Sequence, residues 1–231
     1  MGAFIDIIRD YGFDFLRGTW LTIQLVVISA LLGVLVAVPL ALARMSKTAA
    51  IYWPASLYSI FFRGTPLLVQ FFLIYYGLGQ FDFIRSSVLW PILREAYVCA
   101  LITLTLNTAA YSSEVIRGGI LSVPKGEVEA ARAAGMSAFT AYRLVILPRA
   151  FSLILPAYSN EIIILLKGTS LASTITLLEL MGESQLAASA TYQPIQVFAI
   201  AGVIYYLLTM IITALFRALE SRYNRYLTLA R

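Results

Sequence analysis

Long stretches without a charged side chain alternate with short polar segments along the 231-residue chain. A helix that crosses a bilayer needs about 20 mostly apolar residues, because lipid offers no hydrogen-bond partner to the backbone. The pattern therefore predicts an all-α integral membrane protein with five transmembrane helices in a single transmembrane domain over residues 1–231. The expected spans are residues 19–43, 55–78, 96–116, 150–172 and 194–216.

The fourth of these spans has the weakest signal, because Glu161 and Lys167 interrupt its apolar run. Four helices would follow if that stretch did not enter the membrane. We find no convincing internal repeat, and an odd number of helices argues against two inverted halves within one chain.

Composition supports a membrane protein and excludes several kinds of site. Hydrophobic residues make up 60% of the chain and charged residues 13%, whereas a typical soluble domain is about 25% charged. The sequence has no histidine and one cysteine, Cys99. This argues against a Ser-His-Asp or Cys-His catalytic site, a disulfide framework and a zinc site of the usual kind, so neither a metal nor a cofactor is expected. The net charge of the chain is +5. In a membrane protein such positive charge marks the cytoplasmic loops, so we expect no nucleic-acid partner.

Basic residues predict the orientation, because they concentrate in cytoplasmic loops. With five helices, one side of the membrane carries eleven basic residues and the other carries four. The predicted N-terminus is periplasmic and the C-terminus cytoplasmic. The eleven are Arg44, Lys47, Arg117, Lys125, Arg132, Arg143, Arg149, Arg217, Arg222, Arg225 and Arg231, and the four are Arg9, Arg17, Arg85 and Arg94.

The loop over residues 117–149 is the one sizeable polar segment on the expected cytoplasmic side. Pro124 and Gly126 should end the incoming helix. Acidic residues then suit the first turn of a new, alanine-rich helix, and Gly135 can adopt the positive φ that ends it. A second short helix is expected to run up to Pro148. The pair is either an amphipathic connector resting on lipid or, as we favour, a docking surface for a cytoplasmic partner.

Within this loop, Glu129-Ala130-Ala131, Gly135 and Leu147-Pro148 resemble the EAA segment of bacterial ABC importer permeases. The departure is Val145, where the family usually has isoleucine. Further stretches resemble the polar amino acid branch of these permeases, with the strongest likeness to M-type subunits of histidine, lysine/arginine/ornithine and opine importers. They are Arg63–Gln70, Leu106–Tyr111, Ser122–Gly126 and Leu155–Glu161.

The resemblance implies a permease subunit in a bacterial inner membrane. It would assemble with a second permease, either a related Q-type chain or an identical one, with two ATP-binding subunits, and with a periplasmic solute-binding protein. ATP and Mg²⁺ would bind to the partner ATPase, and the chain itself, which has no Gly-x-x-x-x-Gly-Lys phosphate loop, would not be an enzyme. The ATPase-coupling residues implied are Glu127, Glu129, Ala130, Ala131, Gly135, Leu147 and Pro148.

Charged residues inside the predicted spans are candidates for a solute pathway, because a charge at the bilayer centre costs about 2.5–3.5 kcal/mol unless it is paired or hydrated. An amino acid needs a cation for its carboxylate, which Arg63 or Lys167 could supply, and an anion for its ammonium group, which Glu161 could supply. Asn107 and Asn160 complete the candidate pathway. Alternatively, such charges form fixed pairs across helices or extend to an interface.

The function predicted is ATP-driven import of a polar, basic amino acid or an opine. A carrier that works alone and is coupled to ions or protons would use the same buried carboxylates. The EAA-type loop and the lack of repeats count against that alternative. An intramembrane enzyme is disfavoured by the absence of histidine and of paired catalytic carboxylates.

Overall fold

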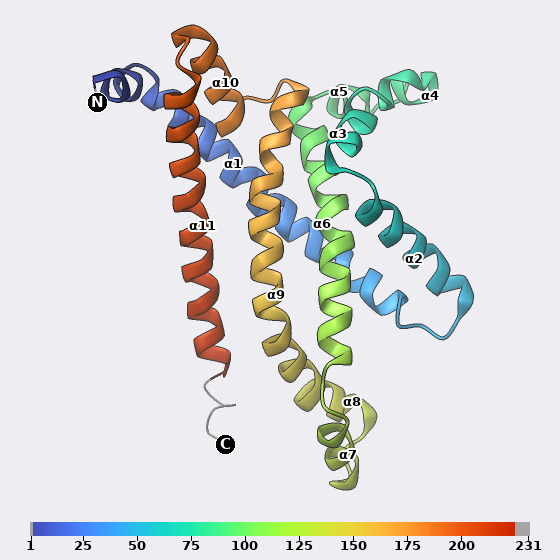
Figure 1. The fold of residues 1–231 in the computed structure, drawn as a ribbon. Coiled ribbons are helices and arrows are strands. Elements are labelled where there is room, and N and C mark those ends of the chain that lie inside the picture. Colours follow the sequence, from blue (N-terminus) through green and yellow to red (C-terminus); the bar gives the residue numbers. More distant parts are fainter. Residues whose placement is uncertain (1, 225–231) are drawn as a thin grey trace.

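The computed structural model describes residues 2–224, and every regular element within that range is a helix. The first helix, α1 (Gly2–Ala43), extends well before the predicted span and crosses diagonally behind the other long helices (Figure 1). Three helices run side by side in front of it: α6 (Ala96–Leu121), α9 (Leu147–Gly168) and α11 (Pro194–Asn224) (Figure 1).

The second predicted span is not one continuous helix. It consists of α2 (Ala49–Gly64) and α3 (Leu67–Tyr75), and the helical segments on the two sides of the break meet at 105°. Pro66 causes the break, because it lacks the N–H that would continue the hydrogen-bond ladder and disfavours helical geometry in the preceding residue. The span predicted over residues 55–78 therefore contains a break at Pro66.

Short elements close the two ends of the bundle. One end carries η1 (Leu78–Gln80), α4 (Asp82–Arg85), α5 (Trp90–Leu93), η3 (Thr169–Ile175) and α10 (Leu180–Thr191). The opposite end carries α7 (Lys125–Ala133), α8 (Ala138–Ala141) and the π-helical turn η2 (Tyr142–Ile146). The start of α1 lies at the first of these ends, and α11 finishes at the second (Figure 1).

Three helical segments in residues 2–224 are long and apolar enough to cross a membrane, or four if the bent pair counts as one span. They are Gly2–Ala43, Ala138–Ile175 and Pro194–Tyr223. The third predicted span corresponds to α6, which is long enough but is not among them, because several Thr, Ser and Asn side chains lower its mean hydropathy. The count of five crossings stays a prediction.

Small side chains let α1 approach α6 closely, as is typical where helices pack inside a membrane. A Cβ atom on Gly33 would lie 2.3 Å from Cγ2 of Thr108, so only glycine fits at this crossing. Fully buried Leu25, Leu104, Phe71 and Leu166 join α1, α6, α3 and α9 in the main apolar core. A second, smaller core forms where α1, α10 and α11 meet.

Candidate functional site

The break between α2 and α3 is held by two amide side chains. Nε2 of Gln70 donates to the carbonyl oxygens of Phe62, at 2.9 Å, and of Thr65, at 3.1 Å. Asn107 of α6 donates to the same Phe62 oxygen, at 3.2 Å, and to Oε1 of Gln70, at 3.0 Å. These bonds supply donors to carbonyl groups that the end of α2 leaves without helical partners, which makes the bend a fixed feature of the fold.

A small polar pocket lies beside this break, between α3, α6 and α9. Asn107, Thr108, Tyr111 and Glu161 contribute its polar side chains, and its apolar walls include Leu67. Its volume of about 20 Å³ leaves room for no more than a water molecule in this state. The pocket therefore marks a polar spot on the helix faces that a change in packing would have to open for a solute.

Arg63 connects this pocket to a cluster of charges. Its guanidinium carbon lies 5.5 Å from the centre of the Tyr111 ring, in cation–π geometry, and Nη1 lies 3.8 Å from a carboxylate oxygen of Glu114. Glu114 also pairs with Arg44 at the end of α1 and with Arg117 one turn further along α6. Three arginines around one carboxylate leave an excess of positive charge next to a pocket that contains Glu161.

The structure therefore brings together part of the predicted solute pathway. Arg63, Asn107 and Glu161 lie in or beside one pocket, although Asn107 is also tied to the helix break. Asn160 and Lys167 are exposed and do not line it. The alternative of fixed ion pairs across helices describes Glu114 well, since two of its three partners, Arg44 at the end of α1 and Arg63 on α2, lie outside α6.

Two contributors were missed as site residues at the level of sequence. Tyr111 lines the pocket and contacts Arg63, and Gln70 holds the break. The signal for Gln70 was present in Gly64 and Pro66, since a helix broken inside a membrane leaves carbonyl groups that need a nearby donor. Nothing in the spacing of Tyr111 indicates its contact with Arg63.

The predicted coupling segment forms the expected pair of short helices. α6 ends at Leu121, and α7 begins after Pro124. Gly135 has φ +76°, and its N–H donates to the carbonyl oxygen of Arg132. The N–H of Met136 donates to the carbonyl oxygen of Ala131. This is a Schellman ending, in which glycine takes the left-handed conformation that other residues adopt at a cost.

The second short helix was expected to end at Pro148, but it continues past this residue. α8, capped by the hydroxyl of Ser137, passes through η2 directly into α9. The N–H of Leu147 donates five residues back, to Tyr142, and Pro148 needs no partner because it has no N–H. Leu147-Pro148 thus lies within a continuous helical rod that begins in the coupling segment and includes Glu161.

The coupling residues divide between the two faces of α7. Glu127 is half-buried and forms an ion pair with Arg149 of α9, with 3.3 Å between Oε1 and Nε. Ala131 is buried on the inward face of α7. Glu129, Ala130 and Gly135 are exposed, together with Ala133 and Ala134. The outward face of α7 therefore carries mostly small, exposed residues, while Glu127 and Ala131 fix α7 to the rest of the chain.

Comparison with known proteins gives a consistent result. The family model described as "Binding-protein-dependent transport system inner membrane component" matches residues 29–225. The octopine transport system permease protein OccM of Rhizobium meliloti is 52% identical over 205 residues, which cover 89% of this chain and 84% of that protein. The histidine/lysine/arginine/ornithine transport system permease protein HisM of Salmonella typhimurium is 41% identical and covers 97% of this chain and 99% of its own.

Solved structures show the same fold. A chain from the crystal structure of an amino acid ABC transporter with histidines superposes with a TM-score of 0.84 at 36% identity and covers 95% of this chain and 98% of its own. A chain of the MetNI methionine ABC transporter in an inward-facing conformation has a TM-score of 0.71 at 18% identity, over 93% of this chain and 98% of its own, and shows the fold alone. The resemblance drawn from the EAA-type segment is confirmed.

Proposed function

We propose a solute, an orientation and a coupling surface for this chain, because it belongs to the family of binding-protein-dependent transport system inner membrane components. It is an inner-membrane permease subunit of the ABC importer class that carries amino acids or opines. We propose that its solute is a polar, basic amino acid or an opine derived from one. The similarity to octopine and histidine/lysine/arginine/ornithine permeases supports this choice.

The observation that carries the proposed solute class is the pocket with Glu161 on one side and Arg63 nearby. A carboxylate in this position suits an ammonium or guanidinium group, and an arginine suits a carboxylate. Glu161 has no hydrogen bond or ion pair within residues 2–224, so its oxygens are available to a ligand. We assign Glu161 to the cationic group of the solute, Arg63 to its carboxylate, and Asn107 to the pocket wall, with Asn160 and Lys167 as outer pathway residues.

The proposed orientation has five crossings, a periplasmic N-terminus and a cytoplasmic C-terminus. The concentration of basic residues around α7, α8 and the end of α11 supports it. The broken pair α2–α3 would then be one crossing, and α6 would cross inside the bundle, where its Thr and Ser side chains are buried. In Figure 1, α11 finishes at the same end of the bundle as α7 and α8, so one side of the membrane would hold both.

The exposed face of α7 is proposed to dock on a separate ATPase, which would bind ATP and Mg²⁺. Glu129, Ala130 and Gly135 would make this contact, and Ala131, Glu127, Leu147 and Pro148 would transmit it into α9. The remaining partners are a second permease chain, either a Q-type relative or a second copy, and a periplasmic solute-binding protein. Membrane lipid surrounds the assembly.

Uptake by the reconstituted complex tests the solute site. Glu161→Gln should weaken transport of arginine, histidine or octopine by about tenfold or more, since a hydrogen bond to a charged group contributes about 1.5–3 kcal/mol. Glu220→Gln is the control, because Glu220 is half-buried on α11 away from the pocket. Unchanged uptake and ATPase stimulation in Glu161→Gln would overturn the assignment.

Capture of the co-expressed ATPase tests the coupling surface. Glu129→Lys and Gly135→Asp should both abolish co-purification, whereas Asp82→Lys, a charge reversal of an exposed residue on α4, should not. A carrier that works alone would continue to transport with either α7 change. Retention of both the ATPase and uptake would therefore contradict the proposed docking face.

A further inference from the structure

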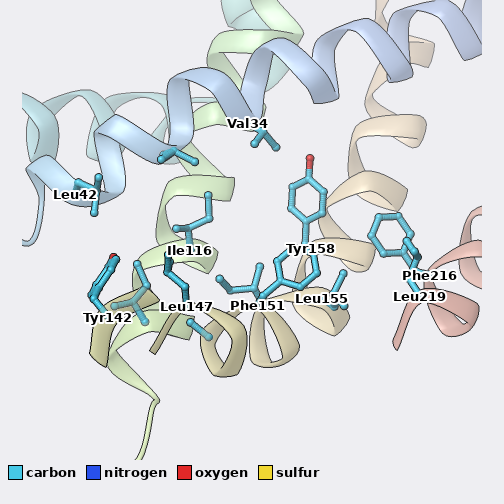
Figure 2. A pocket seen from close by; sticks show the side chains of 14 residues that line it. Val34, Leu42, Ile116, Tyr142, Leu147, Phe151, Leu155, Tyr158, Phe216 and Leu219 are labelled. Carbon is cyan, nitrogen blue, oxygen red and sulfur yellow. The ribbon is translucent and has the colours of Figure 1, made fainter. Parts of the chain in front are cut away.

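An apolar groove lies outside the proposed solute pathway, between α1 and the ends of α6, α9 and α11 nearest the coupling segment. Its volume is about 660 Å³, and every lining residue is aliphatic or aromatic. Figure 2 shows Val34 and Leu42 of α1 above the groove and Phe151, Tyr158 and Leu219 of α9 and α11 across it. None of the charged residues described above lines the groove.

The groove results from the diagonal course of α1. α1 packs tightly on α6, but its last turns diverge from α11, as Figure 1 shows. The floor is held together by two aromatic pairs, with ring centres 6.0 Å apart for Tyr158 and Phe216 and 4.9 Å apart for Phe151 and Tyr223. The groove is therefore a fixed concavity between packed helices.

Arginine side chains flank the end of the groove nearest the coupling segment. Arg143 directly follows the lining residue Tyr142, and Arg222 lies three residues after the lining residue Leu219, so each is within about one helical turn of the groove lining. Both are exposed, and neither has an ion pair within the described part of the chain. Glu220 is the acidic residue nearest to them along α11, which leaves an excess of positive charge.

A ligand that matches this surface has a long hydrocarbon chain and an anionic headgroup. Water would not fill an apolar groove of this kind, because it would find no hydrogen-bond partners there. Basic pockets between transmembrane helices on the cytoplasmic side bind anionic lipid headgroups. We propose that the groove binds an acyl chain of an anionic glycerophospholipid, whose phosphate contacts Arg143 and Arg222.

In the orientation given under the proposed function, this lipid would belong to the inner leaflet. The lipid binding itself does not depend on that orientation. The purified importer complex, with its ATPase, can be incubated with mixed micelles of equal phosphatidylglycerol and phosphatidylcholine and examined by native mass spectrometry. We expect a tightly held phosphatidylglycerol on each copy of this chain. Its preference over phosphatidylcholine should be roughly thirtyfold if both arginines contribute.

Two pairs of variants separate the chain-binding and headgroup-binding parts. Val38→Trp places a large side chain in the groove and should remove the bound lipid, whereas Val27→Trp, on an exposed position of α1 outside the groove, should not. Arg143→Gln with Arg222→Gln should abolish the preference for phosphatidylglycerol, whereas Arg9→Gln with Arg85→Gln, at the opposite end of the bundle, should preserve it.

Equal binding of the two lipids by the unaltered complex would overturn the proposal, and so would an unchanged phosphatidylglycerol adduct in Val38→Trp. Absence of any bound lipid in the intact complex would also overturn it and would indicate that a partner chain covers the groove. Uptake of the solute is measured in parallel. If phosphatidylglycerol is not bound preferentially but uptake is retained, only this inference is contradicted. Uptake by Glu161→Gln tests the proposed function alone.

Discussion

Two glutamates in this chain have opposite surroundings. Glu179, at the start of α10, is completely buried: Oε1 accepts from the N–H of Gly182 at 3.0 Å, and Oε2 accepts from Tyr205 at 2.8 Å and from Thr22 at 3.3 Å. Thr22 in turn accepts from the N–H of Leu180 at 3.2 Å. Glu161 is only half-buried and has no such partner in residues 2–224.

The difference separates a structural carboxylate from an available one. Glu179 joins α1, α10 and α11 through one fully connected network, and such networks fix the relative position of the elements that share them. Glu161 lies on α9, the helix that continues into the coupling segment, and is one of the residues that line a pocket. We therefore expect changes at the Glu179 junction to lower stability and changes at Glu161 to alter transport.

The largest expected effect is that of Glu179→Ala, which removes the cap of α10 and leaves the buried donors of Tyr205 and Gly182 without an acceptor, whereas Thr22 keeps the carbonyl oxygen of Gly18. The expected loss is about 3 kcal/mol in the free energy of unfolding. Glu161→Ala should change it by less than about 0.5 kcal/mol, because no network is broken. Thermal unfolding of the two variants in the same detergent makes the comparison, and equal losses would remove the distinction.

A glycine at the same junction provides the next test. A Cβ atom on Gly18 would lie 2.9 Å from Cα of Leu180, in backbone that cannot move without shifting α10. Gly18→Ala should therefore destabilise the protein by about 2 kcal/mol. Gly202→Ala, on α11, meets nothing within 4 Å and should instead stabilise by about 0.5–1 kcal/mol. If both variants unfold at the same temperature, α1 is not tightly held against α10.

A smaller effect is expected from Tyr205→Phe, which removes one donor from Glu179 and leaves the ring in place. The expected loss is about 1 kcal/mol, since the other two donors remain. Tyr111→Phe is the matched change at the polar pocket, where the hydroxyl makes a long bond of 3.4 Å to the carbonyl oxygen of Arg63. That variant should unfold at an unchanged temperature. A larger loss in Tyr111→Phe than in Tyr205→Phe would reverse the comparison.

Sequence reasoning was successful where the cause is local. Gly135 and Pro124 set the limits of α7 through backbone geometry that the residues themselves impose. It missed the Glu179 junction completely, because residues 173–193 look like a polar connector between two spans. The burial of Glu179 depends on Thr22 and Tyr205, which are distant in sequence and are brought together only by the crossing of α1 over α11.

The same reason accounts for the mixed result at the polar pocket. The cost of a charge in a membrane identified Glu161 and Arg63 without knowledge of the packing. It could not rank Lys167 below them, because whether a charge on α9 faces the pocket or the outside depends on the rotation of that helix. It also could not foresee that Asn107 would be shared between the pocket and the bend, since this depends on the 105° angle of the broken pair.

The smallest expected effect is a dependence of stability on pH. Glu179 lies between the predicted fourth and fifth spans, and burial raises its pKa above the ordinary value, while the hydrogen bonds to its carboxylate oppose the shift. A carboxyl group with a raised pKa in the folded state stabilises the fold most below the pKa of the unfolded chain, and this stabilisation is lost as pH rises through the folded pKa. The unfolding temperature of the unaltered protein should therefore fall more steeply from about pH 4.5 to 8 than that of Glu179→Gln, whose side chain does not titrate. Both proteins share every other titrating group, so the difference between their slopes isolates Glu179. A steeper fall in the Glu179→Gln protein would show the opposite. The hydrogen bonds would then outweigh burial and lower the pKa of Glu179, and the charged carboxylate would be the form that stabilises this junction.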